Sequence, residues 1–394
     1  MILKYILVVV GVMGGVVAAN GQPFVPGNTY YGRDNYIEYF AGNAPLIISV
    51  PHGGYLEPTG MPDRNCTDCS YVRDAYTQEL SRLIKDKFYD RTGCYPHMIV
   101  NLIHRKKLDM NRELIAATDS NAALDDYWYD YHEFVDSAKS TVFNNYAKGL
   151  FIDMHGHGHV KQRIELGYLV SKTTLSLADS LINLPTYTNF TSIRNLALDN
   201  LSALSHVSLL RGSSSMGTYL ATRGFPSVPS SADPFPLAAD EYFNGGYNTV
   251  RHGSNSTGKI DAIQFELYSA IRFDSVERVK FADSMVSVLI KYLDTHYFTN
   301  YAATPCITTA VDEVEDYGQG VRLYPNPAKE WISMQTDREI TYCRIVSSRG
   351  QVMRGYAVAN VSEPLWVADF PHGLYLVQLY DNQGKIYSVR LLKD

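Results

Sequence analysis

The sequence of 394 residues has few cysteines, no block of basic residues and no low-complexity stretch. Five cysteines are too few for a disulfide scaffold, and their odd number leaves at least one thiol without an intramolecular partner. With 35 Lys and Arg against 41 Asp and Glu, the net charge is −6, which argues against a dedicated nucleic-acid binder. The hydrophobic share of 45% is ordinary for a globular protein.

Long apolar runs are also scarce. Beyond the N-terminus, no segment reaches the roughly 18 uninterrupted apolar residues of a membrane-spanning helix. The exception is the run from Ile6 to Val17, which follows Lys4 and precedes two alanines. A cation, a short apolar stretch and small residues predict a secretory signal peptide over residues 1–21, and hence an exported protein without an integral membrane segment in the mature chain. An N-terminal membrane anchor is the alternative.

Apolar periodicity predicts the fold class of the first three quarters of the chain. Short apolar runs alternate with longer amphipathic ones, so we expect an α/β domain over residues 22–298, with a mixed, largely parallel sheet flanked by helices. The expected strands are residues 46–50, 98–103, 150–154, 164–171, 206–210 and 260–267. The expected helices are residues 73–91, 125–148, 192–205, 217–223 and 275–296.

The pattern changes after residue 298. Residues 299–320 carry an acidic cluster and glycines, which predicts a linker. Residues 321–394 contain only short alternating runs broken by Gly and Asn, which predicts a small all-β sandwich. The expected strands are residues 331–335, 342–347, 373–380 and 385–391.

Four motifs of this last segment resemble the C-terminal sorting domain of type IX secretion. They are Leu323-Tyr-Pro-Asn-Pro-Ala328, Ser347-Ser-Arg-Gly350, Gly373-Leu-Tyr-Leu-Val-Gln378 and the basic ending Arg390 to Lys393. The resemblance implies export across the outer membrane of a Gram-negative bacterium, with the secretion machinery as a partner and a secreted or cell-surface location. A carbohydrate-binding or structural sandwich is the alternative.

Histidines stand at the ends of two expected strands. His52 follows strand 46–50, and strand 150–154 leads through Asp153 to His155. Sites in open α/β sheets form beyond the carboxyl ends of the strands, and residues two apart in a strand face the same way. Asp153 can therefore fix the tautomer of His155, and the two histidines predict a zinc site. His157 and His159 follow in the same loop, and their role stays open.

The third zinc ligand is open between two carboxylates. Asp74, at the start of the expected helix 73–91, could reach the same rim, and Glu57 is the competitor. A first-turn aspartate also complements a helix dipole without binding a metal. The pair Cys66 and Cys69 has no partner pair at zinc-ribbon spacing, so we expect a small loop disulfide there.

The expected strand 260–267 carries a carboxylate in its middle, where burial of an unpaired charge is energetically costly. Alternation places Glu266 and Gln264 on the face opposite the apolar residues, and a buried carboxylate needs a partner or a function. We interpret Glu266 as a general base beside an activated water. The structural alternative is a salt bridge to Arg272 or Arg278.

A basic cluster follows strand 98–103. It contains Arg105 and Arg112, with Asn111 beside the second arginine. Such a cluster is ordinarily a solvated surface. At a strand end it can instead hold a carboxylate, because a guanidinium group binds carboxylates in bidentate fashion.

Taken together, six motifs between residues 45 and 295 resemble the N-formylglutamate amidohydrolase family, which is similar to zinc carboxypeptidases. They are Ser49-Val-Pro-His52-Gly-Gly, Arg73-Asp74, Asp109-Met-Asn-Arg112, Asp153-Met-His155, Tyr242-Phe-Asn-Gly-Gly-Tyr247 and Gln264-Phe-Glu266-Leu. The family's named substrate belongs to cytoplasmic histidine breakdown, whereas this chain is expected to be exported.

The resemblance implies a role for each matching residue. His52, Asp74 and His155 would hold one zinc ion, Glu266 would be the catalytic carboxylate, and two arginines would hold the substrate carboxylate or the developing oxyanion. These arginines are Arg105 and Arg112. The implied reaction is hydrolysis of an amide bond in an N-acyl amino acid or peptide-like substrate with a free carboxylate. One departure is Tyr55, which stands where carboxypeptidases have the glutamate of a His-x-x-Glu ligand pair.

Two alternatives belong to other functional classes. Ser215, Asp240 and His252 follow in the order of a serine hydrolase, in a Ser-rich turn that resembles a nucleophile elbow. Ser213 stands where that elbow requires glycine. The other alternative is a non-catalytic surface binding protein, which predicts no bound metal.

Overall fold

The computed structural model of the protein describes residues 24–67, 69–255, 257–301, 306, 321–336, 338–347, 352–358, 363–382 and 386–393. The chain divides into two compact units, one within Val25–Thr309 and one within Ala310–Asp394. The signal peptide expected at residues 1–21 and nearly all of the linker expected at residues 299–320 lie outside the described residues. Over the described part of the chain, no helix is both long and apolar enough to cross a bilayer.

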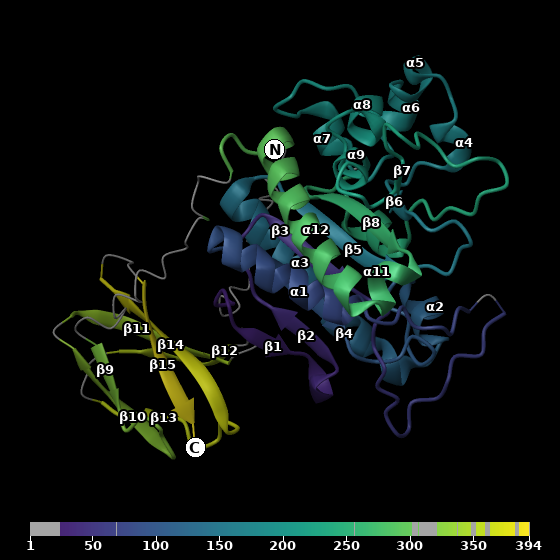
Figure 1. The fold of residues 1–394 in the computed structure, drawn as a ribbon. Helices are drawn as coiled ribbons and strands as arrows, with labels where there is room; N and C mark the ends of the chain where they lie inside the picture. The colour runs from purple at the N-terminus through teal and green to yellow at the C-terminus, as the bar shows by residue number, and fades with distance from the viewer. Residues whose placement is uncertain are drawn as a thin grey trace, which may run out of the picture. The chain divides into compact units, whose positions relative to one another are not determined.

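The first unit is built on one eight-stranded sheet (Figure 1), in the order β1-β2-β4-β3-β5-β8-β6-β7. The pairs β4/β3, β3/β5, β5/β8 and β6/β7 are parallel, and the remaining pairs are antiparallel. This confirms the predicted α/β class with a mixed, largely parallel sheet. The strands are β1 Thr29–Tyr31, β2 Ile37–Phe40, β3 Leu46–Val50, β4 His97–Asn101, β5 Leu150–Gly156, β6 Ile164–Gly167, β7 Ser227–Val228 and β8 Asp261–Leu267.

Two long helices, α1 Thr77–Thr92 and α12 Ser275–His296, lie side by side over one face of the sheet (Figure 1). Their apolar residues share one core with the strand residues that point toward them. Asp274 caps α12 by accepting hydrogen bonds from the backbone N–H groups of Val276 and Glu277, which fixes its start where the sequence predicts it.

The opposite face carries α3 Asp125–Tyr146 and α10 Tyr247–His252. Alternation along the strands separates the two faces. Ile263, Phe265 and Leu267 of β8 belong to the core under α1 and α12, so Gln264 and Glu266 face the other way. The polar residues of the candidate site lie on this second face.

The other helices are short. They are α2 Leu114–Thr118, α4 Lys172–Leu175, α5 Asp179–Ile182, α6 Pro185–Thr188, α7 Arg194–Leu198, α8 His206–Arg211, α9 Met216–Ala221 and α11 Ser269–Phe273, with 3₁₀ turns η1 Arg33–Asn35 and η2 Ala122–Leu124. Most of them lie between β6 and β8 in the sequence.

Three expectations about elements are wrong. The strand expected at residues 206–210 is helix α8, because a five-residue segment with three apolar residues is too short for its periodicity to separate the two forms. The helix expected at residues 192–205 shrinks to α7, which ends at Leu198. The helix expected from residue 73 begins only at Thr77, because Tyr76 adopts a left-handed φ of 66°. Asp74 therefore lies in the loop before α1.

The structure contains one disulfide that the sequence predicts and one that it does not. Cys66 and Cys69 form the predicted loop disulfide, and Cys94 pairs with Cys306. Cys343 is the remaining thiol and is buried.

The second unit contains two antiparallel sheets, with strand orders β13-β10-β9 and β12-β11-β14-β15. The strands are β9 Val321–Tyr324, β10 Trp331–Thr336, β11 Ile340–Ser347, β12 Val352–Ala357, β13 Leu365–Trp366, β14 Gly373–Asp381 and β15 Ile386–Lys393. Buried residues of both sheets, such as Ile332 and Val377, form one core, so the sheets pack face to face as a sandwich.

Candidate metal centre

Three side chains from separate segments meet beyond the carboxyl ends of β3 and β5. His52 lies two residues after β3, His155 lies near the end of β5, and Asp74 comes from the loop before α1. Parallel pairing of β3 and β5 brings these strand ends to one edge of the sheet. Gly54 allows the first loop to pass there, because a side chain at this position would collide with the backbone of Leu102 and Ile103.

The donor atoms of these residues form a compact triangle, and we call His52, Asp74 and His155 the metal cluster. His155 Nδ1 lies 3.1 Å from His52 Nδ1 and 3.1 Å from Asp74 Oδ2. His52 Nδ1 lies 3.4 Å from the same carboxylate oxygen. All three side chains are buried.

The other nitrogen of each ring is held by a further carboxylate. His52 Nε2 lies 2.6 Å from Asp109 Oδ1, and His155 Nε2 lies 2.8 Å from Asp153 Oδ2. A carboxylate can only accept, so each Nε2 carries the proton and each Nδ1 presents its lone pair to the common point. Carboxylate–histidine pairs of this kind orient metal-binding imidazoles.

Asp153 is itself held by hydrogen bonds from a residue of strand β3 and a residue of helix α10. Ser49 Oγ donates to Asp153 Oδ1 at 2.5 Å, and Asn248 Nδ2 donates to the same oxygen at 3.3 Å. Ser49 also hydrogen-bonds Tyr131 of α3 at 2.6 Å. The orientation of His155 is thus set by a chain of contacts that ends in helix packing.

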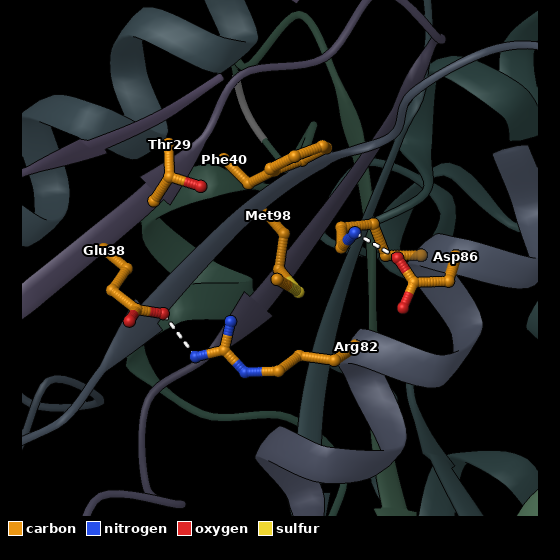
Figure 2. A pocket seen from close by; sticks show the side chains of 7 residues that line it. Thr29, Glu38, Phe40, Arg82, Asp86 and Met98 are labelled. Atoms are coloured by element: carbon orange, nitrogen blue, oxygen red, sulfur yellow. Dashed lines mark hydrogen bonds and ion pairs between the residues drawn. The ribbon is translucent and has the colours of Figure 1, made fainter. Parts of the chain in front are cut away.

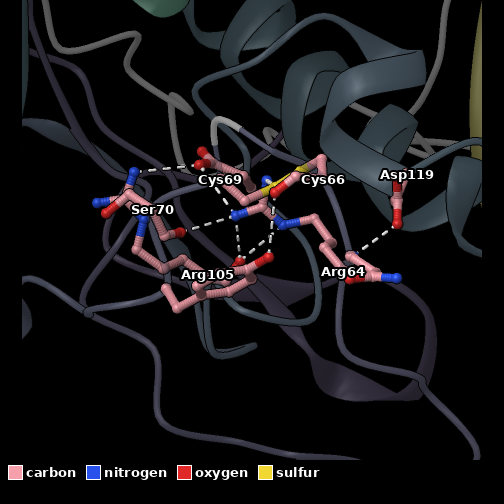
Figure 3. Close-up of a disulfide and its surroundings, with 9 residues drawn as sticks. Arg64, Cys66, Cys69, Ser70, Arg105 and Asp119 are labelled. Atoms are coloured by element: carbon pink, nitrogen blue, oxygen red, sulfur yellow. Dashed lines mark hydrogen bonds and ion pairs between the residues drawn. A yellow bond between two sulfur atoms is a disulfide. The ribbon is translucent and has the colours of Figure 1, made fainter.

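Asp109 is fixed by backbone and guanidinium groups. Its Oδ1 accepts the Asn111 N–H at 3.0 Å, while its Oδ2 lies 3.1 Å from Arg105 and 3.4 Å from Arg64. Figure 3 shows that Arg64 also donates to the Arg105 carbonyl oxygen and reaches the disulfide at Cys69 Sγ, 3.1 Å away. The loop closed by this disulfide therefore holds a buried cation against Asp109.

The donor set fits zinc in geometry and in charge. Ligand atoms about 2.0–2.1 Å from a tetrahedral zinc ion lie about 3.3 Å from one another, which matches the 3.1–3.4 Å edges of the triangle. Three buried carboxylates surround the two imidazoles, and the guanidinium groups that contact these carboxylates belong to two residues, Arg64 and Arg105. A divalent cation would balance this surplus of negative charge.

The pKa shifts of Asp74 and His155 also indicate that the metal cluster favours a cation. Burial alone would raise the pKa of Asp74, yet contacts with His155 and His52 hold it below its usual range. Burial likewise opposes the charged form of His155, but Asp153 and Asp74 raise the pKa of its ring well above the ordinary value. The surroundings therefore favour a positive charge at the His155 ring.

Glu266 lies next to the metal cluster on β8. It is the register partner of His155 in the β5/β8 pairing and accepts a hydrogen bond from Gln264 Nε2 at 2.9 Å. Burial raises the pKa of its carboxyl group to about 8, with Asp74 and Glu165 adding to the rise and His155 opposing it. The structural alternative is not seen in the described ranges, because no ion pair joins Glu266 to Arg272 or Arg278. The guanidinium of Arg272 donates to three backbone carbonyl oxygens, and that of Arg278 donates to the Arg272 carbonyl oxygen.

The two candidates for the third ligand are separated in space. Asp74 shares the triangle with the imidazoles, whereas Glu57 is exposed and pairs with Lys106 at 2.7 Å. The sequence could not separate them because both stand in the loop that links β3 to α1.

The expected substrate residues have differing surroundings. Asn111 is buried, accepts the Asn248 N–H at 2.7 Å and places its Nδ2 3.4 Å from His155 Nε2. Arg105 bridges Asp74 and Asp109, while Arg112 is exposed in the loop after β4. Only Arg112 of these three presents an exposed side chain.

A second histidine-containing group lies beside the first, and we call His157, His159 and Glu165 the flanking cluster. Both ring nitrogens of His157 are used, since Nε2 donates to the Arg163 carbonyl oxygen at 2.9 Å and Nδ1 accepts the His159 N–H at 3.1 Å. His159 Nδ1 lies 2.8 Å from Glu165 Oε1. His157 has no lone pair left for a metal.

The residues of the serine hydrolase alternative have separate partners. Ser215 is buried and caps α9, where it accepts the Thr218 N–H. Asp240 pairs with Lys161 and Arg163, and His252 lies against His132. Within the described ranges, no hydrogen bond joins any two of Ser215, Asp240 and His252.

A cavity of about 180 Å³ lies away from this site, between β1, β2, β4 and α1 (Figure 2). Its charged side chains are already paired, Arg82 with Glu38 and Lys85 with Asp86. Lys85 also lies over the ring of Phe40, 4.3 Å from its centre. The cavity offers no unpaired group for chemistry.

Four polar residues of the site had no individual role in the prediction. Asp109 was part of a motif only, and Arg64, Asn248 and Glu165 were not singled out. Asp109 could have been found, since it follows a strand that neighbours β3. Arg64 comes from a loop and Asn248 from the short helix α10, whose positions no local pattern specifies, whereas Glu165 lies in β6, within a strand that the sequence predicts.

Comparison with known proteins gives a match for the second unit. Residues 322–393 match the family model described as a secretion system C-terminal sorting domain, which confirms that part of the prediction. No curated protein matches the chain.

Two solved structures are similar to the chain at low identity. One is an N-formylglutamate amidohydrolase from Ralstonia eutropha JMP134, with a TM-score of 0.38 and 10% identity over 62% of this chain and 91% of that chain. The other is a gene product from Agrobacterium tumefaciens, with a TM-score of 0.40 and 12% identity over 66% of this chain and 95% of that chain. The first belongs to the family that the sequence motifs resemble.

Proposed function

We propose that this chain is an exported, zinc-dependent amidohydrolase that cleaves an amide bond in an N-acyl amino acid or peptide-like substrate with a free carboxylate. The observation that carries the proposal is the convergence of two Nδ1 lone pairs and one Asp74 oxygen, with each ring locked from behind by its own carboxylate. In the proposal His52, Asp74 and His155 hold one zinc ion. Such a site retains an open position for water or substrate.

A zinc ion held there would act as a Lewis acid that acidifies water and polarises the amide carbonyl group. Glu266 accepts the proton of the attacking water and then delivers it to the leaving nitrogen. Burial, which raises the pKa of this carboxyl group to about 8, favours the protonated form that donates to the leaving nitrogen, and a cation at the metal cluster would favour the ionised form that accepts a proton from water. Arg105, which lies against Asp74, would stabilise the negative charge that develops on the carbonyl oxygen.

Recognition of a substrate carboxylate is assigned to Arg112. Its side chain is exposed in the loop after β4, three residues beyond Asp109, the carboxylate that holds His52 Nε2. The preceding residue, Asn111, is buried, and its Oδ1 accepts the backbone N–H of Asn248 near the start of α10.

Export is supported by the sorting-domain match over residues 322–393. Together with the signal peptide that the sequence predicts at residues 1–21, it leads us to propose type IX secretion and a secreted or cell-surface location in a Gram-negative bacterium. The secretion machinery is then a partner of the second unit.

The central test combines metal content with turnover. Purified protein should contain about one zinc ion per chain, and Glu266→Gln should retain that zinc while turnover falls about 10²–10⁴-fold. Substrates would be a panel of N-acyl amino acids and dipeptides, each with its carboxylate free or amidated. Glu277→Gln, a change at a partly exposed residue in the first turn of α12 that pairs with Lys280, is the control and should leave turnover unchanged. A chain without zinc, or unchanged turnover in Glu266→Gln, contradicts the proposal.

A further inference from the structure

His159 differs from its neighbour His157 in having one nitrogen available. Its Nδ1 donates to Glu165 Oε1 at 2.8 Å, and no residue in the described ranges hydrogen-bonds its Nε2. Its side chain is 13% exposed, so a ligand can reach it, while the Glu165 side chain is only 1% exposed. A buried carboxylate therefore fixes the tautomer of a partly exposed imidazole.

Strand register places this pair beside the proposed reaction centre. Glu165 of β6 is directly opposite Glu266 of β8, and Glu266 is directly opposite His155 of β5. Directly paired residues project to the same face, and neighbouring strands lie about 4.8 Å apart. The His159–Glu165 pair thus flanks Glu266 on the side away from His155.

A carboxylate and an aromatic ring surround His159 Nε2. Glu241 Oε1 lies 3.9 Å from it, and the Glu241 side chain is 64% exposed. The ring of Phe243 stacks on the imidazole at 4.7 Å, and its backbone N–H holds Glu165 Oε2 at 2.8 Å. The nearby cation Lys161 is already paired with Asp240 at 3.0 Å.

The opposite flank has the reverse character. Arg105 and Arg64 lie against Asp109 beyond β4, and the exposed Arg112 follows in the same loop. A substrate whose scissile amide lies at Glu266 would extend its acyl part toward His159. The site is therefore complementary to a molecule with an anion at one end and a cation at the other.

We propose that His159 and Glu241 bind an amino group on the acyl part of the substrate, and that Glu165 is the positioning residue. The preferred substrates are then short peptides with a free amino group beside the scissile amide, rather than simple acylated amino acids. Nε2 accepts a hydrogen bond from the ammonium group, Glu241 supplies the opposite charge, and Phe243 offers its aromatic face. This inference rests on the proposed function, since it assumes that the scissile amide lies at Glu266.

A matched pair of ligands tests it. Alanyl-alanine and propionyl-alanine differ only in the α-amino group, and their dissociation constants would be measured by calorimetry on the full chain in zinc buffer, with Glu266→Gln to prevent turnover. We expect alanyl-alanine to bind about tenfold more tightly or better, since a hydrogen bond to a charged group contributes about 1.5–3 kcal/mol. His159→Phe should bring the ratio to about one.

Two further variants guard against a structural explanation. His159→Gln keeps an acceptor, so a ratio above that of His159→Phe with unchanged zinc content supports the proposal. His104→Phe makes the same exchange in the loop after β4 and should leave the ratio as it was. For turnover, Glu165→Gln should raise the KM for alanyl-alanine more than the KM for propionyl-alanine, whereas a purely structural role would change both alike.

The outcomes separate this inference from the proposed function. Equal binding of the two ligands, or binding of neither, overturns the role of His159. A clear binding preference without hydrolysis by the unmodified chain contradicts the proposed function and leaves the role of His159 standing. Hydrolysis of both compounds with equal kcat/KM supports the proposed function and contradicts the role of His159.

Discussion

The metal cluster and the flanking cluster use the same residue types at neighbouring strand ends, yet they offer different chemistry. In the metal cluster, carboxylates hold the Nε2 atoms of both rings and leave the Nδ1 lone pairs free to converge. In the flanking cluster, backbone groups use both nitrogens of His157. Two histidines and a carboxylate within reach of one another therefore do not define a metal site. What decides whether such a group can bind a metal is whether each ring keeps one nitrogen lone pair free.

The largest effect is expected from exchanging one histidine in each cluster. His155→Ala removes a converging donor and should lower zinc affinity by about 10³-fold or more, so that purified protein loses its zinc. His157→Ala removes a ring with no free lone pair and should retain about one zinc ion per chain. Elemental analysis of the two purified variants, with competition against a zinc-binding dye, measures both.

Thermal unfolding of both variants is the control for folding. The comparison breaks if His157→Ala loses zinc as His155→Ala does while both remain folded, because the flanking cluster would then hold the metal as well.

The sequence alone predicts only part of the difference between the metal cluster and the flanking cluster. Alternation along β5 correctly places Asp153 beside His155, because the side-chain period of a strand is fixed. The same rule places Glu266 on the polar face of β8. His157 and His159 also recur at intervals of two, but only His155 lies within β5, so the sequence could not say where their rings point.

The long helices and five of the eight strands of the sheet were predicted because their signals are local, whereas the short strands β1, β2 and β7 were not predicted. The buried strands are continuous apolar runs, and α12 shows a long periodic pattern with an aspartate cap. The segment from Lys172 to Ala221 was predicted poorly, because its helices have four to six residues and take their form from packing. Asp74 was placed on a helix it does not join, since no pattern foretold the left-handed Tyr76.

A second test asks whether the cationic neighbours, rather than burial itself, keep the carboxylates of the metal cluster ionised. Asp261 is the contrasting case, because it is buried among hydroxyl and backbone groups, and burial raises its pKa from 3.8 to about 6. A raised folded-state pKa adds stability below pH 3.8 that is lost as pH rises through about 6. This difference corresponds to about 3 kcal/mol.

Between pH 4 and 6, the unmodified chain should lose this contribution to its free energy of unfolding as Asp261 ionises. Asp261→Asn has no such carboxyl group and should not show this loss. The measurement is denaturant unfolding of both proteins at a series of pH values. Curves that stay parallel across this window would mean that Asp261 titrates normally, and that burial alone does not distinguish it from Asp74 or Asp109.

A smaller effect is expected from the carboxylates behind the rings. Asp153→Asn keeps the shape of the side chain but removes the charge that fixes the His155 tautomer, so zinc affinity should fall about 10–100-fold. Glu165→Gln makes the matching change behind His159 and should leave zinc affinity unchanged. Dye competition under identical buffer conditions gives both values. A comparable loss in Glu165→Gln would mean that the two clusters share one ion.

The smallest effect belongs to Glu57, the carboxylate that competed with Asp74 for the third ligand position. Its side chain is exposed and pairs with Lys106, outside the triangle of donor atoms. Because solvent screens such a surface pair, Glu57→Gln should change zinc affinity by less than about twofold. Asp74→Asn, with the same loss of one charge, should instead cost most of the bound zinc. If Glu57→Gln lowers zinc affinity as strongly as Asp74→Asn, the loop between β3 and α1 adopts another arrangement when the metal is present, and the donor triangle described above is not the metal site.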